Sequence, residues 1–250
     1  MGFPWGAYDV VTFGVEWVQD FHADSCTEPD LLYRQSEAEG FYNIMQLHGH
    51  IGKFCFGDDN AWETDFCNPD LELGGDALNW SDNVNFCYFA GHGTHKQDQY
   101  VDDMWICFSY AHLGCFAASS RWKLGVKDLK WLVLDSCLGV TDPSADSVVF
   151  WAGPMQGIHI IFAYIGLSYD RGDLGVAFGN EAGTGSPLCN SWIDHAYTYD
   201  DYDPQVSNHP IAIAAGATQD EAIYRREHET INDLSYDVTS TSWLAWKWRD

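Results

Sequence analysis

The chain has 250 residues, enough to bury a full core, and 46% of them are hydrophobic and 16% aromatic, which excludes a disordered protein. Asp and Glu number 37 against 12 Lys and Arg, giving a formal net charge of -25. This charge repels phosphate backbones and anionic bilayers, so neither nucleic acid nor a membrane is an expected partner, whereas cationic peptides and metal ions are. Such acidity also keeps a protein soluble in high salt, which favours a halophilic source.

Targeting segments are not expected. No apolar stretch reaches the length of about 18 residues that spans a bilayer. The start, MGFPWGAYDVVTFGVEWV, lacks a basic leader and a cleavage site, so the cytoplasm is the default compartment, and secretion with a leader missing from this sequence is the alternative. The eight cysteines do not decide between them, because apart from Cys137, discussed below, they show no spacing typical of a metal site or a disulfide framework. Two are expected in the core and five are unassigned: Cys87 and Cys107, and Cys26, Cys55, Cys67, Cys115 and Cys189.

Apolar runs alternate with helical patterns along the chain. In chain order we expect strands at Tyr8 to Val18, Val84 to Gly93, Met104 to Tyr110, Trp131 to Leu134, Gly157 to Gly166, Pro210 to Ala215 and Trp243 to Trp248. Helices are expected at Leu31 to His48, after the turn Thr141 to Ser144, at Ala177 to Ala182, Leu188 to Tyr199 and Gln219 to Asn232, and loops at Gly49 to Asp70, Thr94 to Asp103 and Tyr199 to Pro204. This order predicts one domain over residues 1–250, a three-layer α/β/α fold with a mostly parallel central sheet.

Two of the predicted buried strands end in chemically active residues. The run VNFCYFAGHG brings His92 just past the end of one strand, and WLVL followed by DSCLG does the same for Cys137. In open α/β sheets ligands bind outside the carboxyl ends of the strands, so both side chains are expected at one edge. The sequence therefore predicts a catalytic pair of His92 and Cys137. Ser136 lacks the pattern of a serine hydrolase elbow.

Metal binding is a weaker alternative. Asp58, Asp59 and Asn60 can present oxygens to calcium, but the loop lacks the alternating ligands of an EF-hand, and an acidic turn is the other interpretation. The histidines at His48 to His50 and His92 to His95 do not match the spacing of a zinc site. We therefore expect no metal in the site and keep calcium open for the acidic loop.

The strand, His-Gly, strand and Cys order resembles the caspase-like cysteine peptidases, which include caspases, legumains, gingipains, clostripain and metacaspases. The two residues are 45 positions apart (92 to 137), close to the separation of about fifty known for caspases. YFAGHG and LDSC resemble the metacaspase His and Cys motifs. Metacaspases usually continue with His-Ser-Gly, where this chain has Leu138 to Val140.

The wider context is similar to an uncharacterised bacterial and archaeal family of caspase-like domains. Four segments carry this resemblance: Gly14 to Val18 (GVEWV), Ala61 to Phe66 (AWETDF), Lys130 to Leu132 (KWL) and Ser191 to Ala196 (SWIDHA). The resemblance extends over roughly residues 8 to 235. It implies a caspase-like fold, a peptide or protein as substrate and no cofactor.

The resemblance also implies roles for individual residues. His92 would serve as base or acid for the Cys137 thiol, and the backbone N–H groups of Gly93 and Cys137 would bind the oxyanion. Asp135 matches the acidic residue with which metacaspases bind a basic P1 side chain, so cleavage after Arg or Lys is expected. The alternative is a catalytically inactive caspase-like domain that acts as a binding module or assembles into filaments or homo-oligomers.

Overall fold

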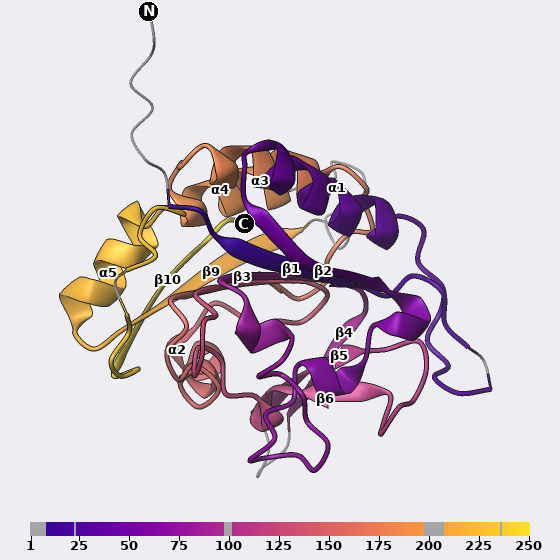
Figure 1. The fold of residues 1–250 in the computed structure, drawn as a ribbon. Helices are drawn as coiled ribbons and strands as arrows, with labels where there is room; N and C mark the ends of the chain where they lie inside the picture. The colour runs from indigo at the N-terminus through magenta and orange to yellow at the C-terminus, as the bar shows by residue number, and fades with distance from the viewer. Residues whose placement is uncertain (1–8, 23, 98–101, 198–207, 236) are drawn as a thin grey trace, which may run out of the picture.

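The structure is a computed structural model that describes residues 9–22, 24–97, 102–197, 208–235 and 237–250. A central sheet runs through the middle of this part of the chain (Figure 1). From one edge to the other its strands are β10 (Trp243–Trp248), β9 (His209–Gly216), β8 (Ile160–Ile165), β7 (Trp131–Asp135), β3 (Phe86–Ala90), β1 (Thr12–Trp17) and β2 (Ile51–Gly57). Neighbouring strands from β2 to β8 are parallel. The strand β9 runs antiparallel to both of its neighbours, β8 and β10.

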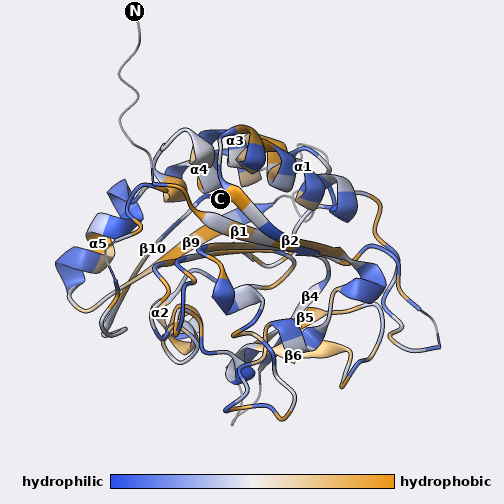
Figure 2. Cartoon of the chain, in the orientation of Figure 1, coloured by the Kyte–Doolittle hydropathy of each residue, from blue (hydrophilic) through white to orange (hydrophobic). Residues whose placement is uncertain are grey.

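Helices cover both faces of this sheet. One face carries α1 (Arg34–Leu47), α3 (Leu174–Gly183) and α4 (Leu188–Ala196), as Figure 1 shows. The other face carries α2 (Ala145–Val148) and a small antiparallel sheet of β4 (Gly93–Gln97), β5 (Asp102–Cys107) and β6 (Phe116–Ala118). The helix α5 (Gln219–His228) packs beside β9 and β10 and is mostly hydrophilic in Figure 2. Short 3-10 helices lie at Asp58–Asn60, Glu63–Asp65, Ser81–Asn83, Ser119–Arg121 and Val149–Ala152.

The sheet separates two apolar clusters, and β3 contributes to both because its side chains alternate between the faces. Tyr88 packs on Phe41 of α1 with 4.8 Å between ring centroids. Phe89 faces the small sheet and lies 5.6 Å from Phe66. Burying each such ring contributes about 1.5–3 kcal/mol, which explains why a strand covered on both faces is apolar throughout.

The helices α1 and α3 approach each other very closely. A Cβ atom at Gly175 would collide with the carbonyl oxygen of Glu37. Only glycine allows this contact, and it holds the first turn of α1 against α3. The position of α1 matters for function because Arg34, its first residue, reaches the carboxyl edge of the strands.

The predicted three-layer α/β fold with a mostly parallel sheet is confirmed, and so are the predicted strands and helices within the described residues. Two predicted loops are wrong in part. Residues Ile51–Gly57 form the edge strand β2, and Gly93–Gln97 form β4. The glycines of β2 do not form turns. They leave space for aromatic rings, because a Cβ at Gly52 would collide with Tyr42. The predicted acidic loop Tyr199 to Pro204 lies outside the described residues.

None of the helices that the structure describes combines the length and the apolar character needed to cross a bilayer.

Candidate functional site

The strands β3 and β7 deliver His92 and Cys137 to the same edge of the sheet. They are parallel neighbours whose last paired residues are Ala90 and Asp135, and the Gly91 N–H donates to the Asp135 carbonyl at 3.1 Å. His92 and Cys137 each follow two residues later. The predicted juxtaposition of the two strand ends is therefore present.

Gly93 packs directly against the backbone of Cys137. A Cβ atom at Gly93 would collide with the Cys137 carbonyl oxygen and would lie 2.8 Å from the Ser136 hydroxyl. The segment that follows His92 is thus in contact with the segment that carries the sulfur. Within the described structure no hydrogen bond joins the His92 ring to that sulfur, and in unliganded enzymes such contacts often form only when substrate binds.

The ring of His92 is oriented by the loop between β1 and α1. Its Nε2 atom lies 2.8 Å from the carbonyl oxygen of Pro29. A carbonyl can only accept, so Nε2 carries the proton and Nδ1 carries the lone pair. The ring of Phe21, from the same loop, lies 5.3 Å away between centroids. In the neutral ring, this contact therefore leaves Nδ1 as the atom that can accept a proton.

Cys137 is half-buried and is a free thiol. The backbone N–H of Ser168 donates to its sulfur at 3.3 Å, and the sulfur lies 3.9 Å from both the carbonyl and the hydroxyl oxygen of Ser168. The next residue, Leu138, has a φ of +62°, an outlier for a bulky side chain. Hydrogen bonds from Leu138 to Gly166 and from Val140 to Tyr164 hold this turn in place. Strain of this kind clusters at functional sites.

Asp135 is fully buried and its carboxylate already has a cationic partner. The Arg34 guanidinium forms an ion pair with it and also lies 3.5 Å from the Asp135 carbonyl. Arg34 further donates to Glu37 and to the Tyr169 carbonyl, both at 3.2 Å. The role predicted for Asp135, binding a basic substrate side chain, stays a prediction, and the structure places an internal arginine on that carboxylate.

Further buried groups complete this network. The Tyr88 hydroxyl donates to Glu37 at 2.8 Å. Burial, with Asp135 adding to it, raises the pKa of Glu37 well above its usual range, while Arg34 and the Tyr88 hydroxyl act in the opposite direction. Asp170 lies 3.3 Å from the Arg34 Nε atom and accepts the Leu32 N–H. Sequence reasoning missed Arg34, Glu37 and Asp170, because none of them lies in a motif or a spacing that indicates a contact with Asp135.

A disulfide joins Cys26 to Cys115, 89 positions apart in the sequence. The sequence leaves both of these cysteines unassigned, because only the folding of the chain brings the two segments together. The half-cystines lie on the loop that orients His92 and on the segment between β5 and β6. The other six cysteines are free thiols.

Most of these free thiols are buried and chemically inert. Burial raises the pKa of Cys55 to about 11 and those of Cys67 and Cys107 to about 12. The pKa of Cys87 is raised well above its usual value for the same reason. A thiol with such a pKa is almost entirely protonated at neutral pH and is a poor nucleophile.

The residues considered for metal binding are engaged with other groups. Among the described residues, no set of three or more His, Cys, Asp or Glu side chains is arranged to hold a metal ion. Asp58 accepts the Gln19 and Asp20 N–H groups at 2.8 and 3.0 Å, and Asp59 lies 2.6 Å from the His22 Nε2 atom. Calcium binding by this loop, which the sequence leaves open beside an acidic turn, stays an untested alternative.

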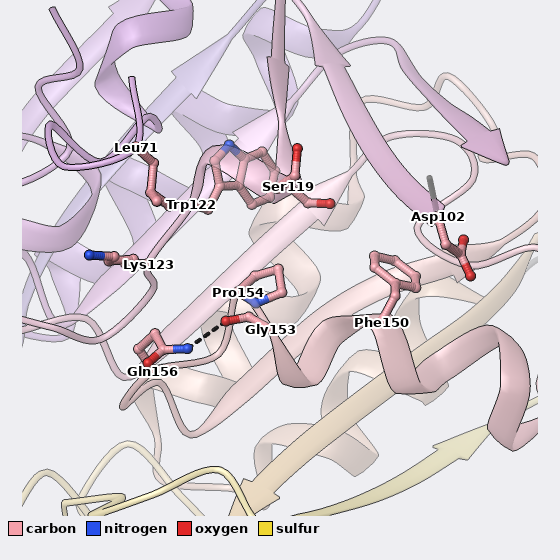
Figure 3. Close-up of a pocket in the computed structure, with 10 residues that line it drawn as sticks. Leu71, Asp102, Ser119, Trp122, Lys123, Phe150, Gly153, Pro154 and Gln156 are labelled. Carbon is pink, nitrogen blue, oxygen red and sulfur yellow. Dashed lines mark hydrogen bonds between the residues drawn. The ribbon is translucent and has the colours of Figure 1, made fainter. Parts of the chain in front are cut away.

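A cavity of about 400 Å³ lies on the small sheet, away from the carboxyl edge of the strands (Figure 3). Neither His92 nor Cys137 contributes to its lining. Its polar groups are occupied: Lys123 pairs with Asp70 at 2.9 Å, and Gln156 donates to the Gly153 carbonyl at 2.5 Å. The candidate site is therefore the strand edge and not this cavity.

The fold and the strand edge define a three-layer α/β protein in which the neighbouring ends of β3 and β7 lead into an oriented imidazole and a free thiol. The chain belongs to the family described as a domain of unknown function, DUF6345, which matches residues 15–248. A caspase-1 from Spodoptera frugiperda is a similar solved structure, with 8% identity, a TM-score of 0.47, and coverage of 82% of this chain and 86% of that chain. No curated protein matches the sequence.

Proposed function

We propose that this protein is a cysteine endopeptidase in which Cys137 is the nucleophile and His92 transfers the proton. One observation carries the proposal: the matched ends of β3 and β7, with Gly93 packed on the Cys137 backbone, bring a thiol and an imidazole to one edge. The Pro29 carbonyl supports the same role, because it fixes the tautomer in which Nδ1 can accept a proton.

The reaction follows from these groups. The Cys137 sulfur bonds to the carbonyl carbon of the scissile peptide while its proton passes to the His92 Nδ1 atom. The C–N bond then breaks, His92 gives this proton to the leaving amine, and the acyl group remains on sulfur as a thioester. Water adds to the thioester, releases the carboxylic acid and restores the thiol.

The backbone N–H of Gly93 is suited to the oxyanion. Cys107 donates its N–H to the His92 carbonyl at 3.0 Å, and Gly93 lies opposite Ile106 in the ladder of β4 and β5. Hydrogen-bonded and non-hydrogen-bonded pairs alternate in an antiparallel ladder. The Gly93 N–H therefore points away from β5 and is not used by the ladder, so it can serve beside the Cys137 N–H as the proposed oxyanion donor.

The substrate would be a peptide or protein, and the net charge of -25 favours a cationic one over nucleic acid or anionic lipid. Cleavage after Arg or Lys would place the basic side chain at Asp135. Because Arg34 pairs with that carboxylate, a basic P1 side chain must share it or displace Arg34. The P1 preference is therefore set by the strength of this internal ion pair.

The test is covalent labelling by a peptidyl acyloxymethyl ketone with Arg at P1, alongside the same probe with Leu at P1. Wild-type protein should form a thioether that is lost in Cys137→Ala and strongly slowed in His92→Ala. Cys55→Ser is the matched control, because this half-buried thiol lies on β2. Equal labelling of wild type and Cys137→Ala would refute the proposal.

A second candidate is a caspase-like module that assembles with copies of itself, and one observation favours it. The strand β10 ends the sheet and exposes Trp243 and Trp248 by 49% and 42%. An aromatic edge strand is a template for pairing with another chain. Light scattering would show a dimer or filament that Trp243→Lys dissolves, and a monomer at all concentrations would exclude this alternative.

A further inference from the structure

Both groups that orient the His92 ring come from one loop. This loop, residues 18–33 apart from residue 23, joins β1 to α1 and is called the 18–33 loop. It supplies the Pro29 carbonyl at 2.8 Å from Nε2 and the Phe21 ring at 5.3 Å. Cys137, by contrast, is set by β7 and by the Ser168 N–H. The orientation of the imidazole therefore depends on the 18–33 loop, and that of the sulfur does not.

Hydrogen bonds fix the two ends of the 18–33 loop. The Asp58 carboxylate accepts the Gln19 and Asp20 N–H groups at 2.8 and 3.0 Å, and the Leu31 N–H donates to the Gln19 carbonyl at 2.8 Å. These contacts close the base of the loop. They do not reach its middle, where the chain passes through Cys26.

The middle of the loop is tied covalently. The disulfide from Cys26, three positions before Pro29, reaches Cys115 on the segment between β5 and β6. The Ala111 N–H donates to the Ser25 hydroxyl at 3.0 Å, and this hydrogen bond joins the same two segments. The same segment begins at Cys107, whose N–H bonds the His92 carbonyl at 3.0 Å.

These contacts form a closed circuit around His92. Its backbone carbonyl is held by β5, the segment after β5 is bonded to Cys26, and the chain after Cys26 returns to its ring nitrogen through Pro29. The disulfide is the covalent connection in this circuit between the two segments. Breaking it leaves the two segments joined by hydrogen bonds, which include those from Ala111 to Ser25 and from His22 to Ser109, in place of a covalent bond.

We infer that the Cys26–Cys115 disulfide is a positioning element for His92, and that a dithiol which reduces it lowers peptidase activity; the effect on turnover rests on the function proposed above. In the reduction the S–S bond breaks, each sulfur gains one electron and one proton, and the dithiol becomes a cyclic disulfide. The Pro29 carbonyl then no longer stays at Nε2. The imidazole loses its fixed tautomer, so kcat falls while substrate binding at Cys137 is retained.

Titration with dithiothreitol tests the effect on turnover. Wild-type activity should rise as oxidised Cys137 is recovered and then fall as Cys26–Cys115 is reduced, with the number of thiols that are alkylated after denaturation increasing from six to eight. In Cys26→Ser/Cys115→Ser only the rise should occur, to a plateau with kcat lower by roughly tenfold or more and KM within about twofold. Cys55→Ser should behave as wild type.

The ring tautomer tests the inference without any turnover. The ¹³Cδ2 shift of His92, assigned by comparison with His92→Gln, should report Nε2–H in oxidised wild type and a mixture of tautomers after reduction or in the double variant. Unchanged tautomer and kcat would overturn the inference. A tautomer change in a protein that cleaves no peptide would support the positioning role of the disulfide and refute the peptidase function. If the double variant does not fold, reduced wild type with an intact near-UV spectrum provides the same comparison.

Discussion

Arg34 and Asp135 form an ion pair whose side chains are 2% and 1% exposed, directly behind the turn that carries Cys137. Such a pair is stabilising only while both charges are present, because a lone buried charge has lost its water. Replacing Arg34 with Met should therefore destabilise the fold by about 3–5 kcal/mol. Urea unfolding measures this loss.

The double variant Arg34→Met/Asp135→Asn removes both charges. It should be less destabilised than the sum of the single variants, because each single variant leaves one charge uncompensated. Additive effects would show that the two side chains do not depend on each other. The cycle requires no activity, so it examines the ion pair separately from the peptidase.

The same pair makes a prediction about specificity. Folded Arg34→Gln protein no longer has the internal cation on Asp135, so a basic substrate side chain can pair with that carboxylate. The ratio of kcat/KM for P1 Arg over P1 Leu should then rise by roughly tenfold or more, since an ionic hydrogen bond is gained. A ratio equal to that of wild type would remove Asp135 from substrate binding. Lys123→Gln, which removes a cation paired with Asp70 away from the edge, is the control.

Thiol alkylation should be selective for Cys137. Cys55, Cys67 and Cys107 have pKa values raised to about 11, 12 and 12 by burial, and the disulfide protects two further sulfurs. Near pH 7.5, iodoacetamide should add about one equivalent to folded protein, because the thiolate is the reactive form. Peptide mapping should locate it at Cys137. Labelling spread evenly over the free thiols would mean that the strand edge gives Cys137 no special access.

Asp65 makes stability depend on pH. Burial raises its pKa to about 7 from an ordinary value of 3.8, with Asp76 and Glu63 adding to the effect of burial. Between these two pKa values the folded state holds a proton that the unfolded state has lost, so the contribution of Asp65 to stability is greatest below about pH 4 and is lost as pH rises through about 7. Glu16, also buried with a raised pKa, acts in the same direction.

Asp65→Asn keeps the oxygen that accepts the Trp62 N–H but cannot ionise. It should be more stable than wild type by roughly 2–4 kcal/mol near pH 8 and equal to it near pH 4, since each pKa unit corresponds to about 1.4 kcal/mol. Chemical unfolding across this range gives the two slopes. Parallel slopes would contradict the assignment, and Asp146→Asn, at an exposed position, is the matched control.

The sequence predicts an element best when a single structural reason explains its residue pattern. The run from Phe86 to Ala90 is apolar because both faces are covered, and this predicted both the strand and the place of His92. The strand Ile51–Gly57 was missed because its glycines are there for ring packing and look like turn residues. Short-range patterns cannot separate these two causes.

The contacts that complete the site come from long-range packing. Pro29 meets His92 across 63 positions, Arg34 meets Asp135 across 101, and Cys26 meets Cys115 across 89. Each residue looks ordinary in its own segment, and only the order of strands in the sheet brings the partners together. The identities of His92 and Cys137 were thus within reach of the sequence, and the groups that orient and surround them were not.

Salt should stabilise this protein. The acidic groups behind the net charge of -25 repel one another, and the screening length falls from about 10 Å at 0.1 M salt to about 3 Å at 1 M. The melting temperature should therefore rise by several degrees between about 0.05 M and about 1 M NaCl. CaCl₂ at matched ionic strength should give the same rise, because Asp58 and Asp59 already bind groups of the chain. A larger rise with calcium that a chelator reverses would instead establish an ion site in the acidic loop. If the melting temperature rises with neither salt, the acidic groups do not repel one another in the fold.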